Sequence, residues 1–238
     1  MTRKLCLWSG PRNISTALMY SFAQRPDTQV VDEPLYAHYL KVSGKPHPGR
    51  EEILDSQENE GAKVVAQMLG EWAKPVVFFK QMAHHLMQLD RAFLEEVNNL
   101  LLIRQPAEVI VSFSKVIPEP KLYDIGIKTQ YELFQNLVAL GQRPVVLDGP
   151  ELRKNPSKVL QELCKRLGIP FYEEMLRWEA GARPEDGIWA PYWYDAVHRS
   201  THFQPYVARE VQVAPASQNV LNESQPYYDA LFEHAIKV

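Results

Sequence analysis

The sequence predicts an α/β fold in which an open, mostly parallel sheet is flanked by helices. Short apolar runs bounded by Gly, Pro or charged residues recur along the chain, and such runs are typical of buried strands. Between them lie longer segments whose apolar residues have the three-and-four spacing of a helix face. The alternation indicates strand-helix-strand units, and we expect residues 1–238 to form a single domain.

Five runs predict strands and five segments predict helices. The strands are expected at residues 5–8, 29–31, 76–79, 100–103 and 145–147. The helices are expected at residues 15–23, 61–72, 107–115, 129–140 and 156–167. The last helix has a marked start at Asn155-Pro156 and a glycine stop at Gly168. Residues 181–205 interleave Gly, Pro, Trp and Tyr with charges, which predicts a long ordered loop.

The composition excludes several classes of protein. With 26 basic and 29 acidic residues the net charge is −3, so we expect no binding to a nucleic-acid polymer through a global field. Cys6 and Cys164 lie far apart in apolar surroundings, which predicts buried free thiols without a disulfide framework or a metal site. No stretch approaches ~20 apolar residues, so we expect no membrane span and a reducing, cytoplasmic location.

A candidate phosphate-binding loop follows the first predicted strand. Backbone N–H groups of the turn and of the helix start would converge on one anion, favoured by the helix dipole. Arg12 can pair with phosphate oxygens, and Ser15 and Thr16 add hydroxyl donors. The candidate residues are Gly10, Pro11, Arg12, Asn13, Ile14, Ser15 and Thr16. The segment lacks the lysine of G-x-x-x-x-G-K-[ST], which disfavours triphosphate chemistry; the alternative is an ordinary strand-to-helix turn.

A second candidate anion site follows the fourth predicted strand. Arg104 stands at the strand end, where ligands bind in open parallel sheets, and Ser112 lies eight positions later. In the alternative interpretation, Ser112 is a hydroxyl on a helix surface and Arg104 pairs with an acidic side chain.

These motifs together resemble the sulfotransferase superfamily. Residues 10–16 are similar to its G-P-R-x-x-S-T loop for the 5′-phosphosulfate, in the form typical of bacterial and carbohydrate-modifying members. Arg104 and Ser112 match the spacing of its 3′-phosphate pair, and Leu167-Gly168-Ile169-Pro170-Phe171 resembles a closing element of the family. The resemblance spans about residues 4–172 and implies a P-loop-like nucleotide-binding architecture. It also implies 3′-phosphoadenosine 5′-phosphosulfate as donor and 3′,5′-adenosine bisphosphate as product. The family's late glycine-rich basic motif is not found.

The resemblance also suggests catalytic residues. Glu33, in Asp32-Glu33-Pro34 after the second strand, is similar to the family's catalytic glutamate and is the expected base, with Asp32 as competitor. Lys80 ends the third strand and, with Arg12, would stabilise charge on the leaving group. The alternative for Glu33 is a solvated charge that ends a strand. No metal ion is expected.

Histidine and aromatic residues are the candidates for acceptor binding. His84 and His85 could bind the acceptor or replace Glu33 as base, although such histidines are more often capping or surface groups. Trp189, Trp193 and His198 could line an acceptor pocket or its lid within a C-terminal segment at 173–238, or could simply pack that segment.

Three functional hypotheses follow. The leading one is transfer of a sulfuryl group to a hydroxyl or amine of a small-molecule acceptor. The others are a P-loop kinase or nucleotide hydrolase without the usual lysine, and a catalytically silent nucleotide-binding protein. The sequence names neither the acceptor nor the oligomeric state.

Overall fold

The computed structural model describes residues 2–115, 117–208 and 210–238. Five strands form one parallel sheet in the order β2-β3-β1-β4-β5. Their bounds are β1 Arg3–Ser9, β2 Thr28–Asp32, β3 Val76–Met82, β4 Asn98–Ile103 and β5 Val145–Asp148. All five predicted strands and the predicted α/β class are confirmed. The central residues of β1, β3, β4 and β5 are buried apolar side chains, which is why these sequence runs are continuous, whereas the edge strand β2 alternates between buried and more exposed positions.

The five predicted helices are also confirmed. They are α1 Ser15–Ala23, α4 Gly61–Leu69, α5 Pro106–Phe113, α7 Ile127–Ala139 and α9 Pro156–Leu167. Helices α1 and α9 have the predicted bounds, and the ends of the other three differ by up to three residues. The prediction for α4 ran too far, because the helix stops at Gly70. Both predicted signals of α9 are present: the Asn155 side chain accepts from the Lys158 N–H, and Gly168 closes the helix with φ of 63°.

Further helices were not predicted. The longer ones are α2 Tyr36–Ser43, α3 Arg50–Ser56, α8 Gly149–Lys154 and α12 Gln218–Phe232. Short helical turns are α6 Leu122–Ile125, α10 Ala190–Trp193, α11 Asp195–His198, η1 Ala83–Leu86, η2 Ala92–Glu96, η3 Glu173–Leu176 and η4 Pro215–Ser217. Residues 181–205 are therefore not wholly a loop. Helix α12 contains Pro226, which breaks an ordinary helix pattern.

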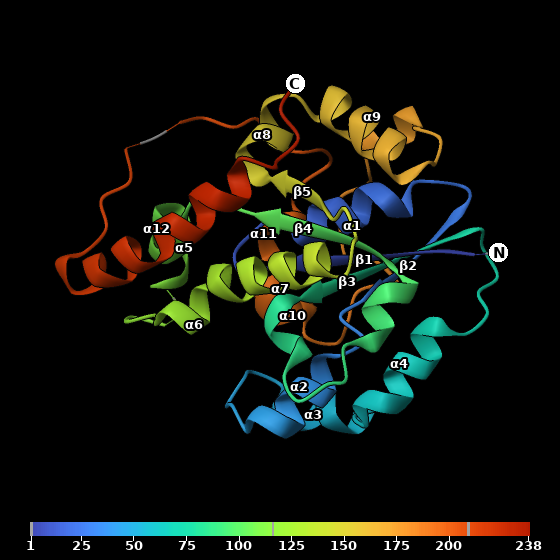
Figure 1. Ribbon diagram of the computed structural model, residues 1–238, viewed down its shortest axis with the longest axis horizontal. Helices are drawn as coiled ribbons and strands as arrows, with labels where there is room; N and C mark the ends of the chain where they lie inside the picture. The colour runs from blue at the N-terminus through green and yellow to red at the C-terminus, as the bar shows by residue number, and fades with distance from the viewer. Residues whose placement is uncertain (1, 116, 209) are drawn as a thin grey trace. The chain divides into compact units, whose positions relative to one another are not determined.

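The chain divides into two compact units. Unit 1 comprises Met1–Leu7, Ser15–Asn99 and Tyr172–Phe203. Here β2 pairs with β3 in a register that sets Asp32 beside Lys80. Helix α1 packs on both strands, and α2 lies against α3 (Figure 1).

Unit 2 comprises Trp8–Ile14, Leu100–Phe171 and Gln204–Val238. Strand β4 pairs with β5 in a register that sets Ile103 beside Asp148. Helix α12 lies along α7 and also contacts α5 (Figure 1). The segment after α12 returns to the sheet, where Ala235 forms a parallel bridge with Val146.

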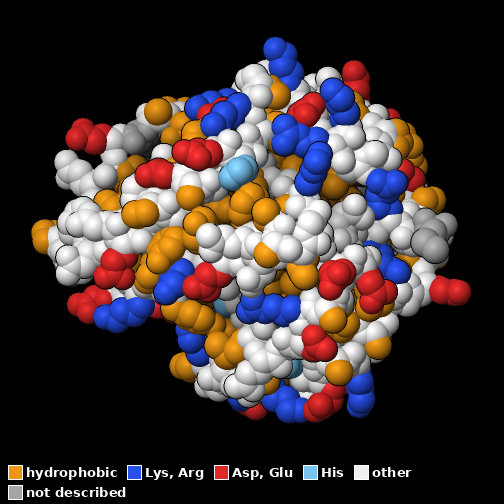
Figure 2. Space-filling view, in the orientation of Figure 1, with side chains coloured by type: hydrophobic (Ala, Val, Ile, Leu, Met, Phe, Trp, Pro, Cys, Tyr) orange, Lys and Arg blue, Asp and Glu red, His pale blue; other side chains and the backbone are white. Residues whose placement is uncertain are grey.

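Surface charge is mixed. On the face drawn in Figure 2, acidic and basic side chains are interspersed, as the small net charge leads one to expect. Among the described residues, no helix has the length and apolar character needed to cross a membrane.

Candidate active site

The loop between β1 and α1 is held in a fixed shape by its own side chains. The Asn13 amide donates to the Leu102 carbonyl at the end of β4 (2.9 Å), and its oxygen accepts from the Ile14 N–H (2.9 Å). A Cβ atom at Gly10 would lie 2.8 Å from the Ile125 carbonyl oxygen, so only glycine fits there. The Ile14 N–H is thus satisfied within the loop, by the Asn13 side chain.

Arg12, Arg104 and Ser112 come together in unit 2. The Arg12 Nε donates to the Ser112 hydroxyl (3.2 Å), and the Arg104 guanidinium donates to the Arg12 carbonyl (2.6 Å). Burial, and then the nearby charge of Arg104, lower the pKa of Arg12. Among the described residues no carboxylate pairs with Arg12, whereas Arg104 is paired with Glu108, so Arg12 is the cation left to attract an anion.

A cavity of about 360 Å³ opens beside this pair. Its lining combines three basic residues, one acidic residue and one serine with a valine of α5 and four residues from the segment before α12. These are Arg104, Glu108, Val111, Ser112, Lys115, Arg153, Pro205, Tyr206, Val207 and Val211. Its size and positive lining suit a phosphate group.

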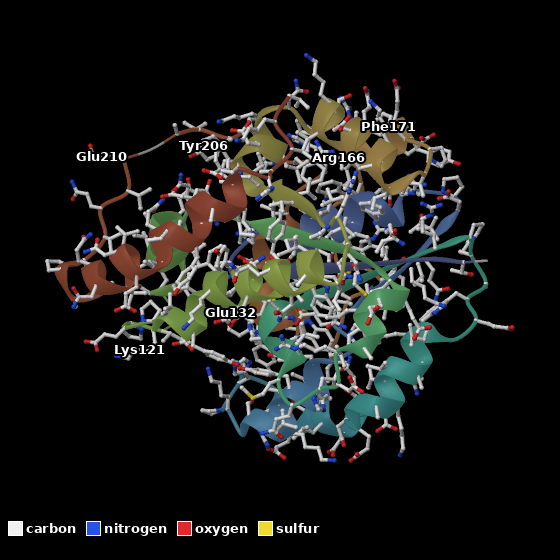
Figure 3. The ribbon with its side chains drawn as sticks, in the orientation of Figure 1. Lys121, Glu132, Arg166, Phe171, Tyr206 and Glu210 are labelled. Carbon is white, nitrogen blue, oxygen red and sulfur yellow. The ribbon has the colours of Figure 1, made fainter. Side chains whose placement is uncertain are left out.

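The sequence analysis selected only Arg104 and Ser112 among these lining residues, and the polar ones that it missed include Glu108, Lys115, Arg153 and Tyr206. Glu108 is the acidic partner that the alternative interpretation expected for Arg104, whose Nε donates to it (2.8 Å). Glu108 also accepts from the Tyr206 hydroxyl (2.8 Å). Arg153 donates to the carbonyls of Gln204 and Pro205 and so fixes the backbone that precedes Tyr206. Tyr206 is labelled in Figure 3. Lys115 also lines the cavity. Only the four-residue spacing between Arg104, just before α5, and Glu108, in its first turn, could have signalled any of this.

A buried ionic cluster forms in unit 1 around Lys80. Its ammonium donates to Asp32 Oδ1 (2.8 Å), to Glu33 Oε1 and to the Tyr194 hydroxyl (2.6 Å). An ammonium has three N–H donors, so this set uses all of them. Lys80 is fully buried, and the β2–β3 register explains why it meets Asp32.

Tyr194 completes the cluster, although it was not among the predicted site residues. Its hydroxyl donates to Asp32 Oδ2 (2.7 Å) and accepts from the Trp189 indole (3.0 Å). The Gly187 N–H donates to the same Asp32 oxygen (3.1 Å). Both oxygens of Asp32 are thus bonded, which leaves Glu33 as the better candidate base.

Glu33 is held in an uncommon conformation. Its φ of 41° lies in the left-handed region, which costs a residue with a side chain about 1–3 kcal/mol. The backbone is fixed on both sides, because the Glu33 N–H donates to the Lys80 carbonyl (2.8 Å) and its carbonyl accepts from Tyr36 (3.0 Å).

The charges of this cluster shift one another's protonation. Burial raises the pKa of Glu33, with Lys80 opposing it. Burial alone would lower the pKa of Lys80, but the Asp32 and Glu33 carboxylates raise it. The cluster therefore keeps Lys80 charged and gives Glu33 a greater affinity for a proton, as a general base needs.

The two adjacent histidines have different surroundings. His85 is fully buried, and its ring is stacked on Tyr36 and Tyr39, with each pair of centroids 5.1 Å apart. The half-buried His84 also contacts the Tyr39 ring. A purely capping or surface role is therefore wrong for His85.

The predicted aromatic residues of the C-terminal segment lie in unit 1. Trp189 is buried beside Tyr36 in an apolar cluster, and Trp193 packs against the same cluster. His198 is held elsewhere by Asp186, whose carboxylate lies 2.9 Å from its Nε2. The remaining loop residues are Pro11, which is half-buried, and Ser15 and Thr16, which begin α1. Among the described residues, no group of three or more His, Cys, Asp or Glu side chains could hold a metal ion.

Comparisons with known proteins show what the chain is similar to. A family model described as "Sulfotransferase domain" matches residues 3–235. Two Arabidopsis thaliana proteins, branched-chain-amino-acid aminotransferase-like proteins 1 and 2, are 40% and 38% identical to the chain over 229 residues, or 95% of it. The chain spans 41% of the length of these relatives.

Two solved structures resemble the chain over nearly its whole length. The sulfotransferase domain from the curacin biosynthetic pathway has a TM-score of 0.54 at 16% identity, covering 94% of this chain and 98% of that one. A sulfotransferase from Alicyclobacillus acidocaldarius has a TM-score of 0.52 at 13% identity, covering 99% and 98%. At these identities the likeness concerns the fold, and it confirms the predicted architecture.

Proposed function

The chain belongs to the sulfotransferase family, and on that premise we propose that it transfers a sulfuryl group to a hydroxyl or amine of a small-molecule acceptor. The observation that carries the proposal is the pair of guanidinium groups, Arg12 and Arg104, gathered with Ser112 beside a positively lined cavity. When bound, 3′-phosphoadenosine 5′-phosphosulfate would supply the activated sulfuryl group.

The proposed nucleotide-binding residues form two groups, one for each end of the nucleotide that carries phosphate. Arg104 and Ser112 would hold the 3′-phosphate, and Lys115 and Arg153 add charge to the same cavity. Arg12 and the rest of the loop would hold the 5′ end: Gly10, Pro11, Asn13, Ile14, Ser15 and Thr16. Because Glu108 already bonds Arg104, a phosphate must share or displace that carboxylate.

The residues of unit 1 would carry the acceptor side of the reaction. Glu33 takes the proton as the acceptor oxygen or nitrogen bonds to sulfur and the sulfur–phosphate oxygen bond breaks. The released 3′,5′-adenosine bisphosphate carries the extra negative charge, which Arg12 and Lys80 stabilise. Since all three Lys80 donors are occupied, Lys80 reaches a ligand by exchanging one of them, and the neutral Tyr194 hydroxyl costs least to release.

The aromatic cluster is the proposed wall of the acceptor pocket. Trp189 belongs to this cluster, Trp193 packs against it, and His84 contacts its Tyr39 ring. His198 is paired with Asp186, which links two parts of the C-terminal segment. In this proposal residues 1–238 act as one domain, and the segment 173–238 covers the substrates. A cytoplasmic location and independence of metal ions stay predictions, as does the lack of nucleic-acid or membrane partners.

The first experiment compares nucleotide binding by calorimetry. Without metal, we expect 3′,5′-adenosine bisphosphate to bind at least about tenfold more tightly than adenosine monophosphate. The reason is that hydrogen bonds from charged groups to the 3′-phosphate should add at least ~1.4 kcal/mol to the binding free energy. Arg104→Ala should abolish this preference. Arg166→Ala removes an exposed arginine of the same unit and should leave it intact (Figure 3). Preferred binding of adenosine triphosphate with magnesium would support a kinase or hydrolase instead.

The second experiment separates catalysis from binding. Glu33→Gln keeps the size of the side chain but removes the base, so we expect the turnover rate to fall about 10²- to 10⁴-fold. Affinity for the bisphosphate should stay unchanged. Glu95→Gln, at an exposed position of unit 1, serves as the matched control. Wild-type protein that binds nucleotide but turns over no acceptor would indicate the silent alternative.

A further inference from the structure

His85 is a buried histidine close to Glu33. Its side chain is fully buried, and neither Nδ1 nor Nε2 has a hydrogen-bond partner among the described residues. Leaving a buried polar group unpaired costs about 1–3 kcal/mol, so such groups are uncommon unless they serve a purpose.

The imidazole faces the proposed base. His85 Nε2 lies 3.7 Å from Glu33 Oε2, just beyond hydrogen-bonding distance, while Lys80 bonds the other oxygen of the same carboxylate. Tyr36 and Tyr39 stack on the ring with interplanar angles of 11° and 30°. Because rings on α2 hold the imidazole, it cannot turn away from Glu33 without disrupting that packing.

The surroundings keep His85 neutral. Burial lowers the pKa of His85 well below its usual value, and the nearby His84 and Lys80 lower it further. The charged and titratable groups that face it are Glu33 after β2, Lys80 on β3, His84 beside it, Tyr36, His38 and Tyr39 on α2, and His47 between α2 and α3. A neutral imidazole keeps one N–H, which can be donated to a carboxylate.

We propose that His85 is a positioning residue for Glu33: its Nε2–H faces Glu33 Oε2 already in the free protein and donates a full hydrogen bond to it when the acceptor binds. Hydrogen bonds of active sites are often long in the free enzyme and shorten in the complex. With Lys80 on one oxygen and His85 on the other, the plane of the carboxylate is fixed towards the acceptor. With or without acceptor, an N–H that points at Glu33 favours its ionised form, which is the form that accepts a proton. This inference rests on the proposed function of Glu33.

The kinetic test uses two variants that separate the nitrogens of the ring. The amide of His85→Gln places a donor near the position of Nε2, whereas His85→Asn reaches only that of Nδ1. We expect His85→Asn to lower kcat about 10- to 100-fold, the effect of losing a hydrogen bond to a charged group, with little change in KM. His85→Gln should recover most of this loss. His202→Gln, at an exposed position, should change nothing.

The pH profile distinguishes positioning from simple packing. Without the donor the pKa of Glu33 rises, so the acid limb of kcat/KM should move to higher pH in His85→Asn and stay in place in His85→Gln. An acid limb at the same pH in both variants and wild type would overturn the proposal.

A measurement without turnover keeps this inference separate from the proposed function. Carbon-13 NMR of glutamate-labelled protein follows the Glu33 carboxyl carbon, which is assigned by its loss in Glu33→Gln. We expect its titration midpoint to rise by about 0.5–1 pH unit in His85→Asn, whether or not an acceptor is known. An unchanged midpoint in a variant with unchanged circular dichroism overturns the inference. Wild-type protein without sulfotransferase activity overturns the proposed function instead.

Discussion

At the scale of the residue, two residues of the proposed site have a strained backbone conformation. Arg12 and Glu33 have φ of 54° and 41°, and the described residues include only one further case without glycine, Gln88. Such conformations persist where surrounding bonds over-determine them, and they are enriched at functional sites. Here the Arg104 guanidinium donates to the Arg12 carbonyl, and the Glu33 N–H donates to the Lys80 carbonyl. These two hydrogen bonds provide the restraint.

Asp148 gives a prediction about stability and pH. This carboxyl caps α8 through the Glu151 N–H (3.0 Å) and accepts from the Tyr228 hydroxyl (3.0 Å). Burial raises its pKa to about 6, above the value of about 3.9 in an unfolded chain. A raised folded pKa gives stability that is complete below the unfolded pKa and is lost as pH rises through the folded one.

We therefore expect Asp148→Asn to gain stability relative to wild type by about 2–3 kcal/mol between pH 4 and pH 7. The asparagine oxygen can still cap the helix, so the difference isolates the charge. Urea unfolding at several pH values measures it, with the exposed Asp55→Asn as a control whose difference should stay flat. A constant difference for Asp148→Asn would contradict the prediction.

At the scale of the element, helix α9 is the clearest case of local encoding. Its start has an asparagine cap with proline in the first turn, and its end has a glycine with positive φ. Both features act within a few residues of the helix ends, so the sequence alone predicted them.

Loss of the α9 cap should have a defined cost. Asn155→Ala removes the acceptor for the Lys158 N–H, and we expect the free energy of unfolding to fall by about 1 kcal/mol. Asn155→Ser keeps a capping oxygen and should lose little. The denaturant midpoint should shift without a change of slope. Equal losses in both variants would show that the cap is not responsible.

At the scale of the whole molecule, ligand binding should be visible as stability. A ligand that binds only the folded protein, at 100 times its Kd, raises the free energy of unfolding by about 2.7 kcal/mol. We expect this for 3′,5′-adenosine bisphosphate and expect Arg104→Ala to remove most of it at the same concentration. Hydrogen exchange should slow in residues 8–14 and 100–115 of unit 2. Equal stabilisation by adenosine triphosphate with magnesium would contradict a selective 3′-phosphate site.

The sequence by itself determined the strands, the main helices and the residues that follow each strand. Apolar runs and helical spacing depend on neighbouring residues, and motifs at strand ends keep their order in any parallel sheet. Thus Glu33, Lys80, Arg12 and Arg104 could be selected without coordinates.

Only the tertiary structure decided which distant side chains complete the clusters. Tyr194 reaches Lys80 across 114 positions, and Tyr206 reaches Glu108 across 98, spacings that carry no periodic signal. The register of β2 and β3 pairs Asp32 with Lys80, and the stacking on α2 buries His85. Helix α12 was equally hidden, because Pro226 opposes helix formation locally and packing against α7 outweighs it. Local patterns are set by adjacent residues, whereas hydrogen-bond partners far apart in the chain are set by the packing that brings them together.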